Sequence, residues 1–174
     1  MSQMYKIGEK LLTLSDISKI LSEGIKIELS SKSDKKVKEC RKYLDEKIKN
    51  SEVPIYGVNT GFGSLCNHKI SAEDLEQLQR NLVLSHSCGT GDEVPQDIVK
   101  IMLLLKIQSL SYGHSAVQLQ TINRLIDMFN HNILPVVYQQ GSLGASGDLA
   151  PLAHMSLVLL GLGETYIPNK DGCF

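Results

Sequence analysis

The residues with the clearest potential for chemistry lie in a loop rich in glycine and serine, residues 141–152, which reads GSLGASGDLAPL. The loop does not bind phosphate as a P-loop does, because it lacks the lysine of the G-x-x-x-x-G-K-[ST] pattern. It does not hold a hydrolase nucleophile either, because neither serine lies in a G-x-S-x-G pattern. A catalytic pair of Ser146 and His154 is also disfavoured, since eight residues of helix separate them by about 12 Å.

The tripeptide Ala145-Ser146-Gly147 can do chemistry of a different kind through its backbone. If the loop bends tightly, the amide nitrogen of Gly147 can approach the carbonyl carbon of Ala145, because glycine has no side chain to obstruct it. Ring closure with loss of water, and loss of a second water from the Ser146 side chain, leaves a five-membered ring with an exocyclic methylene. Asp148 is expected to cap the next helix, whose N-terminal end favours electron density moving onto the ring.

Three blocks of sequence, in order along the chain, support this interpretation. Residues 56–63 read YGVNTGFG, residues 78–86 read LQRNLVLSH, and residues 141–154 read GSLGASGDLAPLAH. Through these blocks the chain resembles the aromatic amino-acid ammonia-lyases and aminomutases over essentially its whole length. A glycine turn that caps a helix would explain the last block alone, but it would not explain the three blocks together.

The resemblance implies that Ala145, Ser146 and Gly147 become the family's cofactor, 4-methylidene-imidazol-5-one (MIO), without a metal. In the family this electrophile captures the amino group of the substrate or, in an older proposal, its aromatic ring. Tyr56 is then expected to be the base that removes a proton from the β-carbon before ammonia leaves. A phenol is a weak base at neutral pH, so the site must favour the phenolate. By residue type alone, Tyr56 would be a half-buried core residue.

Ser85 and His86 are expected to select the substrate. The resemblance implies a histidine-specific member, because tyrosine-using relatives place the histidine one position earlier and phenylalanine-using relatives have apolar or aromatic residues here. An imidazole has one donor and one acceptor nitrogen, so it can bind the imidazole of a substrate. The expected reaction is therefore elimination of ammonia from L-histidine to give urocanate.

Asn59 and Gly63 are expected to shape the pocket beside Tyr56. Ser142 and Asp148 are expected to support the loop that holds the tripeptide, residues 141–148, which we call the electrophile loop. His68, His114 and His131 match no catalytic position, and His114 is expected in a turn and His131 at a helix C-terminus. His154 follows the electrophile on the next helix and is expected to have a packing or supporting role.

Hydrophobic periodicity predicts a mainly α protein, and the resemblance makes it the N-terminal part of the ammonia-lyase helical fold with one or two short β segments. Helices are expected after a Ser15 cap over residues 16–23, and over about 31–49, 71–89, 95–112, 117–130 and 149–162. Short strands are expected near residues 25–29 and 53–58. Residues 1–92 would hold mixed helices, short strands and the tyrosine loop, and residues 93–174 would begin the central helical region, with the C-terminal bundle absent.

Composition excludes several classes of function. The net charge of −1 gives no electrostatic reason to bind nucleic acid or an anionic membrane. The longest apolar runs are far shorter than the ~20 residues that span a bilayer, and no signal peptide is recognisable. The four cysteines form no C-x-x-C pair, which indicates a reduced, cytoplasmic protein without a zinc site.

Members of the family are much longer than this chain, and their carboxylate-binding arginine lies in the part that is missing here. We therefore expect the isolated chain to be inactive, with its tripeptide uncyclised. Apolar helix faces without partners predict association, as a homo-oligomer (a tetramer in the family) or with a C-terminal fragment. Two alternatives stay open: a tyrosine or phenylalanine ammonia-lyase or aminomutase, and a non-catalytic truncated helical module that serves assembly.

Overall fold

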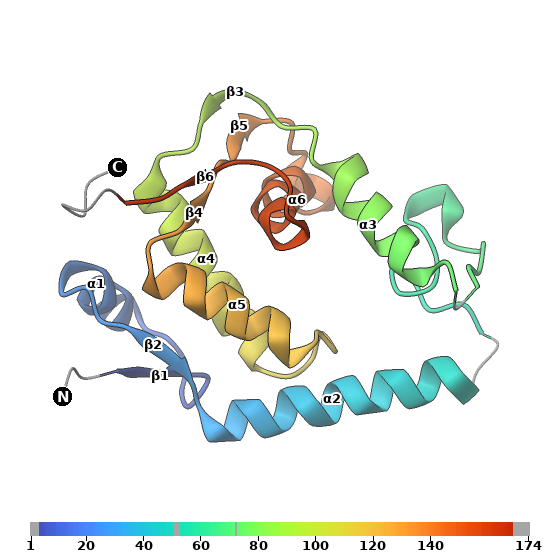
Figure 1. The fold of residues 1–174 in the computed structure, drawn as a ribbon, viewed down its shortest axis with the longest axis horizontal. Helices are drawn as coiled ribbons and strands as arrows, with labels where there is room; N and C mark the ends of the chain where they lie inside the picture. The colour runs from blue at the N-terminus through green and yellow to red at the C-terminus, as the bar shows by residue number, and fades with distance from the viewer. Residues whose placement is uncertain (1–3, 51–52, 72, 169–174) are drawn as a thin grey trace. The chain divides into compact units, whose positions relative to one another are not determined.

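The computed structural model describes residues 4–50, 53–71 and 73–168, and Figure 1 labels its elements. The chain divides into two compact units whose segments alternate along the sequence. Unit 1 consists of residues 1–49, 95–134 and 165–174, and unit 2 consists of residues 50–94 and 135–164. Helices make up most of the regular structure and the strands are short, which confirms the prediction of a mainly α protein.

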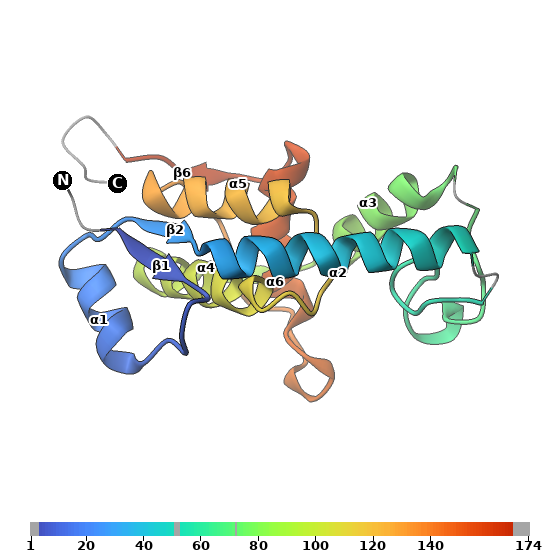
Figure 2. The ribbon, with the colours of Figure 1, turned by 90° about the horizontal axis from the view of Figure 1, so that it is seen from below.

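Unit 1 begins with two short parallel strands, β1 (Tyr5–Ile7) and β2 (Ile27–Leu29). They lie side by side in both views (Figures 1 and 2), with Tyr5 opposite Ile27. The sequence predicted β2 but not its partner β1. The Asn130 side chain continues the sheet, because its amide both accepts from the Ile27 N–H and donates to the Ile27 carbonyl at 2.8 Å.

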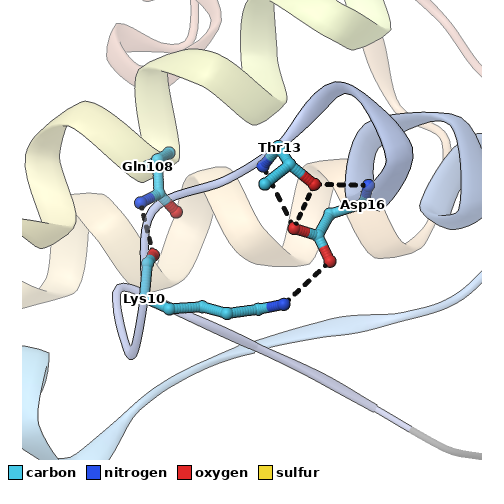
Figure 3. Close-up of polar contacts among 4 residues, drawn as sticks. All are labelled: Lys10, Thr13, Asp16 and Gln108. Atoms are coloured by element: carbon cyan, nitrogen blue, oxygen red, sulfur yellow. Dashed lines mark hydrogen bonds and ion pairs between the residues drawn. The ribbon is translucent and has the colours of Figure 1, made fainter.

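The first helix, α1 (Leu14–Ser22), starts one residue after Thr13, so the predicted Ser15 cap is wrong. The Thr13 hydroxyl accepts from the Asp16 N–H at 3.1 Å, and the Asp16 carboxylate accepts from the Thr13 N–H at 3.0 Å. This reciprocal capping box satisfies two backbone donors that a helix start otherwise leaves free. Lys10 adds an ion pair to Asp16 at 3.0 Å, and Gln108 donates to the Lys10 carbonyl at 3.2 Å (Figure 3).

The long helix α2 (Ser31–Asn50) is mostly solvated, as its mixed charges predicted. Pairs spaced four residues apart line it, including Asp34 with Lys38 at 2.7 Å and Arg41 with Asp45 at 2.6 Å. Among residues 4–50, 53–71 and 73–168, no helix combines the length and apolar character needed to traverse a bilayer.

The core of unit 1 forms where α4 (Gln96–Ser111) packs against α5 (Leu119–Asn130). Both helices were predicted within two residues of these bounds. Their buried apolar side chains are Val99, Leu103, Leu104, Ile107, Leu110, Ile122, Leu125, Ile126, Met128 and Phe129. Two further strands, β4 (Leu134–Pro135) and β6 (Thr165–Tyr166), form a two-stranded sheet.

Unit 2 is built around α3 (Leu75–His86) and α6 (Leu149–Leu157), which pack against each other. Its strands β3 (Thr90–Glu93) and β5 (Tyr138–Gln140) pair in antiparallel fashion, and the sequence predicted neither. Three short 3-10 turns complete the described chain: η1 (Gly63–Leu65), η2 (Gly144–Ser146) and η3 (Val158–Leu160).

Three predictions about unit 2 are wrong. The strand expected at 53–58 is a turn, because the N–H groups of Val58 and Asn59 both donate to the Ile55 carbonyl. The α3 helix begins at Leu75 rather than at residue 71, because Ser71 and Asp74 hydrogen-bond each other in a turn ahead of it. The last helix ends at Leu157 rather than at 162, and η3 follows it.

Candidate active site

The tyrosine loop, residues 56–63, is held from within by polar side chains. Asn59 is buried, and its side-chain oxygen accepts from the Ile55 N–H at 2.6 Å. Thr60 is also buried, and its hydroxyl accepts from the Gly57 N–H at 3.2 Å. Tyr56 itself is 62% exposed, so it is not the core residue that its type alone would predict.

Aromatic contacts link this loop to the end of α3. The Phe62 ring lies 5.5 Å from the Tyr56 ring and 5.2 Å from the His86 ring, and it meets His86 edge to face at 83°. Gly57 makes room for Phe62, since a Cβ at Gly57 would lie 2.7 Å from the phenylalanine ring. From α3, the Gln79 amide donates to the Gly57 carbonyl at 3.2 Å and to the Val58 carbonyl at 2.9 Å. The row of three rings, Tyr56, Phe62 and His86, is thereby fixed to α3.

His86 is the last residue of α3, and its own helix orients its ring. The ring nitrogen Nδ1 lies 2.7 Å from the Leu82 carbonyl, which can only accept, so Nδ1 carries the hydrogen. Nε2 is then an acceptor in the neutral imidazole. The Ser85 hydroxyl donates to the same carbonyl at 3.1 Å, and its oxygen lies 3.1 Å from Nδ1 of His86.

The electrophile loop follows β5 and leads into α6. Figure 2 shows the orange segment after residue 140 extending below α6. The Ser142 hydroxyl closes the loop by donating to the Asp148 carboxylate at 2.7 Å. Asp148 occupies the N-cap position of α6 as predicted, but its side chain caps no helix N–H, because its carboxylate serves Ser142 instead. Ala145 and Gly147 are exposed, and the side chain of Ser146 lies outside the described part of the structure.

The backbone conformation of this loop requires a glycine at position 147. Gly147 has a φ of 95°, which residues with a side chain rarely adopt, and a Cβ built there would meet nothing within 4 Å. Glycine is therefore needed here for its conformation and not for packing. The Gly147 N–H donates to the Gly144 carbonyl at 3.3 Å, so that contact must break before the nitrogen can reach the Ala145 carbonyl carbon.

Gly89, three residues after the end of α3, contacts both α6 and the start of the electrophile loop. The Gly89 N–H donates to Nε2 of His154 on α6 at 2.9 Å. At the start of the loop, a Cβ on Gly141 would lie 3.0 Å from the Gly89 Cα. His154 thus makes a packing and hydrogen-bonding contact with the backbone at Gly89, and the role predicted for it from the sequence stays a prediction.

All ten predicted site residues lie in unit 2. The structure links Tyr56 to His86 through Phe62, and it links Ser142 to Asp148 across the loop. The Tyr56 hydroxyl accepts from the Gly63 N–H at 3.4 Å, rather than meeting the tripeptide. Phe62 and Gln79 were not predicted from the sequence. Phe62 lies inside the tyrosine loop and could have been recognised there as a second aromatic residue, whereas nothing in the sequence around Gln79 marks it as a site residue.

Three further histidines lie elsewhere along the chain. His131 is the C-cap of α5, as predicted, with Nδ1 2.8 Å from the Asp127 carbonyl. His114 is exposed in the turn after α4, and His68 is exposed after η1. Within the described residues, no group of three or more His, Cys, Asp or Glu side chains is placed to hold a metal ion.

Residues 12–171 match the family model described as aromatic amino acid lyase. The chain is 44% identical to the histidine ammonia-lyase of Streptococcus sanguinis over 98% of its own length and 33% of that protein. It is 49% identical to the histidine ammonia-lyase of Legionella pneumophila (strain Lens) over 94% of its length and 32% of that protein. The chain thus spans about a third of the length of these curated relatives.

Solved structures give the same picture of the fold. The histidine ammonia-lyase of Trypanosoma cruzi is 30% identical, with a TM-score of 0.83 over 95% of this chain and 32% of that one. The tyrosine aminomutase of Streptomyces globisporus is 31% identical, with a TM-score of 0.84 over 97% of this chain and 31% of that one. The described elements therefore follow the helical fold of these enzymes.

Proposed function

Because the chain belongs to the aromatic amino acid lyase family, we propose that it forms part of a histidine ammonia-lyase, which eliminates ammonia from L-histidine to give urocanate. The names of its curated relatives support this substrate. The observation that carries the proposal is that a single compact unit holds the tyrosine loop, His86 and the Ala-Ser-Gly turn.

In this proposal Ala145, Ser146 and Gly147 form the MIO ring. When it is formed, the ring supplies an electrophilic carbon that no standard side chain offers. The space around Gly147 supports this role, because a Cβ built there would meet nothing within 4 Å. The positive end of α6, which begins at Leu149, lies next to the tripeptide and favours negative charge there.

The phenolate oxygen of Tyr56 takes the proton from the β-carbon of the substrate and becomes the neutral phenol. The electron pair of that C–H bond forms the Cα–Cβ double bond, and the Cα–N bond breaks to release ammonia. Tyr56 is suited to this because its hydroxyl is near the loop surface, where the Gly63 N–H and the Phe62 ring orient it. General base catalysis requires such a fixed direction as well as access to the proton.

His86 binds the imidazole of the substrate. Its Nε2 is an acceptor in the tautomer that the Leu82 carbonyl selects, so it can receive the N–H of a histidine side chain. A phenyl ring offers no such donor, and a site that must hydrogen-bond its substrate discriminates strongly against an analogue without the group. A tyrosine-using enzyme is the second candidate, since the fold is equally similar to a tyrosine aminomutase.

We also propose that the working enzyme contains further polypeptide, as a homo-oligomer or with a C-terminal portion. Large apolar side chains at the surface support association, among them Leu14, which is 85% exposed, and the loop residue Leu143. Cys40, Cys66 and Cys88 are free thiols, which is typical of the reducing cytoplasm.

A segment exchange tests the proposal. This chain replaces the matching third of the S. sanguinis histidine ammonia-lyase, and urocanate formation from L-histidine is followed beside product formation from L-tyrosine and L-phenylalanine. The expected result is urocanate as the main product, and no product from the Ser146→Ala variant, which lacks the hydroxyl that is lost in forming the methylene. A folded exchange protein that prefers tyrosine, or that stays active as Ser146→Ala, contradicts the proposal.

The tripeptide is proposed to stay open in the chain by itself, since the Gly147 N–H is engaged by Gly144. Intact-mass measurement decides this point directly. A mass equal to the plain sequence is expected, and a loss of two water molecules would show that the ring forms without further polypeptide.

A further inference from the structure

The start of the electrophile loop and the helix that follows the loop, α6, both contact Gly89, three residues after His86. The start of the loop packs there, since a Cβ on Gly141 would lie 3.0 Å from the Gly89 Cα and 3.1 Å from the Cys88 carbonyl oxygen. The end of the loop leads into α6, and His154 of α6 accepts the Gly89 N–H at 2.9 Å. A single backbone position thus contacts the first residue of the loop and the helix that follows it.

Gly89 has no room for a side chain at this junction. A Cβ there would lie 2.9 Å from Nε2 of His154 and 3.2 Å from the Tyr138 Cβ. Contacts under 3.0 Å essentially never occur for a real Cβ, so any other residue would push the imidazole away. Because Gly89 has no left-handed backbone conformation in the structure, the requirement is steric rather than conformational.

The imidazole of His154 can accept this hydrogen bond only in its neutral form. Its Nε2 accepts a hydrogen bond, so in the neutral ring the hydrogen must lie on Nδ1. The Tyr138 ring packs edge to face against it, with centroids 5.2 Å apart at 76°. Burial lowers the pKa of His154 below its ordinary value, which keeps the accepting form populated at neutral pH.

We propose that His154 is a positioning residue of the lyase site, whose neutral imidazole holds the segment after His86 against α6 and thereby against the start of the electrophile loop. His154 touches no substrate in this role; it acts through Gly89. The proposal rests on the proposed function for the reaction it serves, whereas the contact itself is a property of the chain alone.

Two substitutions separate the hydrogen bond from the packing of the ring. His154→Phe keeps an aromatic ring against Tyr138 but removes the acceptor. His154→Gln places an amide oxygen the same number of bonds from the backbone as Nε2, so it can restore the acceptor. His131→Phe is the matched control, because His131 is an exposed histidine at the end of α5 in unit 1.

The first measurement is amide hydrogen exchange by NMR on the 174-residue chain, which needs no activity. In His154→Phe, exchange at Gly89 and at residues 141–148 should accelerate roughly five- to tenfold, the value of one hydrogen bond. His154→Gln should restore most of the protection, and His131→Phe should leave both sites unchanged. The nitrogen shifts of the His154 ring should also show an unprotonated Nε2. Unchanged exchange at Gly89, or a change confined to Gly89 that never reaches the loop, would overturn the proposal.

The second measurement uses the segment-exchange enzyme. His154→Phe should lower kcat at least roughly tenfold, as expected for a displaced reacting group, and His154→Gln should recover most of it. If His154 were merely structural, His154→Gln would not recover kcat even when its thermal stability equals that of His154→Phe. That result would also overturn the proposal. If the segment-exchange enzyme without a substitution makes no urocanate, the proposed function fails. The amide hydrogen-exchange data on the 174-residue chain still decide whether the contact between His154 and Gly89 exists.

Discussion

The two units of the chain are stabilised in different ways. Unit 1 contains most of the buried apolar side chains among the described residues, concentrated on α4 and α5. Unit 2 contributes Val136, Val137, Ala150, Ala153 and Met155 to that set. Its site segments are held instead by polar side chains on backbone groups and by glycines in tight places, such as Asn59, Gln79 and Gly89.

This difference separates stability from function. Apolar burial is non-directional and contributes most of the free energy of folding, but it does not fix a ring to within a few tenths of an ångström. Hydrogen bonds contribute less free energy each and specify direction. Substitutions in unit 1 should therefore change the free energy of unfolding, whereas substitutions in unit 2 should mainly disturb the site.

The largest effect is expected from Leu103→Ala in the core of unit 1. Leu103 is 0% exposed, and removing a fully buried leucine side chain costs about 3 kcal/mol of unfolding free energy. Leu105→Ala on the same helix is the control, because Leu105 is 46% exposed and should lose less than about 1 kcal/mol. Urea denaturation measures both, and equal losses would contradict the assignment of the core.

A smaller loss, about 2 kcal/mol, is expected from Gly89→Ala, which overpacks the junction with His154 in unit 2. Gly144→Ala in the same unit is the control, since its nearest neighbour would be the Asp148 carboxylate at an ordinary 3.7 Å. Thermal unfolding followed by circular dichroism compares the two variants. Should Gly144→Ala be the more damaging, the tight contact at Gly89 would be disproved.

About 1 kcal/mol is expected to be lost in Thr13→Ala, which breaks the capping box of α1 in unit 1. Ser15→Ala distinguishes this from the sequence prediction, because Ser15 is exposed within the helix and should be nearly neutral. The free energy of unfolding of the two variants settles which residue caps α1; a larger loss for Ser15→Ala would restore the original prediction.

How much of this could be predicted from the sequence depends on the distance between partners. The helices α2, α4 and α5 follow from local periodicity and were predicted closely. The pairs β1–β2 and β3–β5 were missed, because Tyr5 opposite Ile27 and Thr90 opposite Gln140 are encounters between distant residues that no local pattern reports. The candidate site residues were proposed from their motifs, whereas the contact of His154 with Gly89 spans 65 positions and required the structure.

The smallest effects on stability should come from the titration of single side chains, Asp16 in unit 1 and His154 in unit 2, and they should fall in different pH ranges. Hydrogen bonds from the Thr13 hydroxyl, from the Thr13 N–H and from Lys10 lower the pKa of Asp16 to about 2. Its contribution is present above its ordinary value of 3.8 and is lost as the pH falls toward 2.

The contribution of His154 to stability is also lost as the pH falls, but at a higher pH than that of Asp16. Its pKa in the folded chain is lowered by burial, so the unfolded chain binds the proton more readily, and its contribution is lost as the pH falls below the ordinary value of 6.5. Amide exchange recorded as the pH is lowered should therefore show Gly89 losing protection before Asp16 does. The reverse order would contradict the assignment of an accepting, neutral His154.

The alternation of the two units along the chain has a consequence for synthesis on the ribosome. Within unit 2, residues 50–94 emerge before residues 135–164. The elements α3 and β3 therefore find their partners α6 and β5 only when the second segment has followed. The intervening stretch of about 40 residues takes roughly 2–8 s to translate at ~5–20 residues per second. During that interval α3 and β3 lack the segments against which they pack in the complete unit.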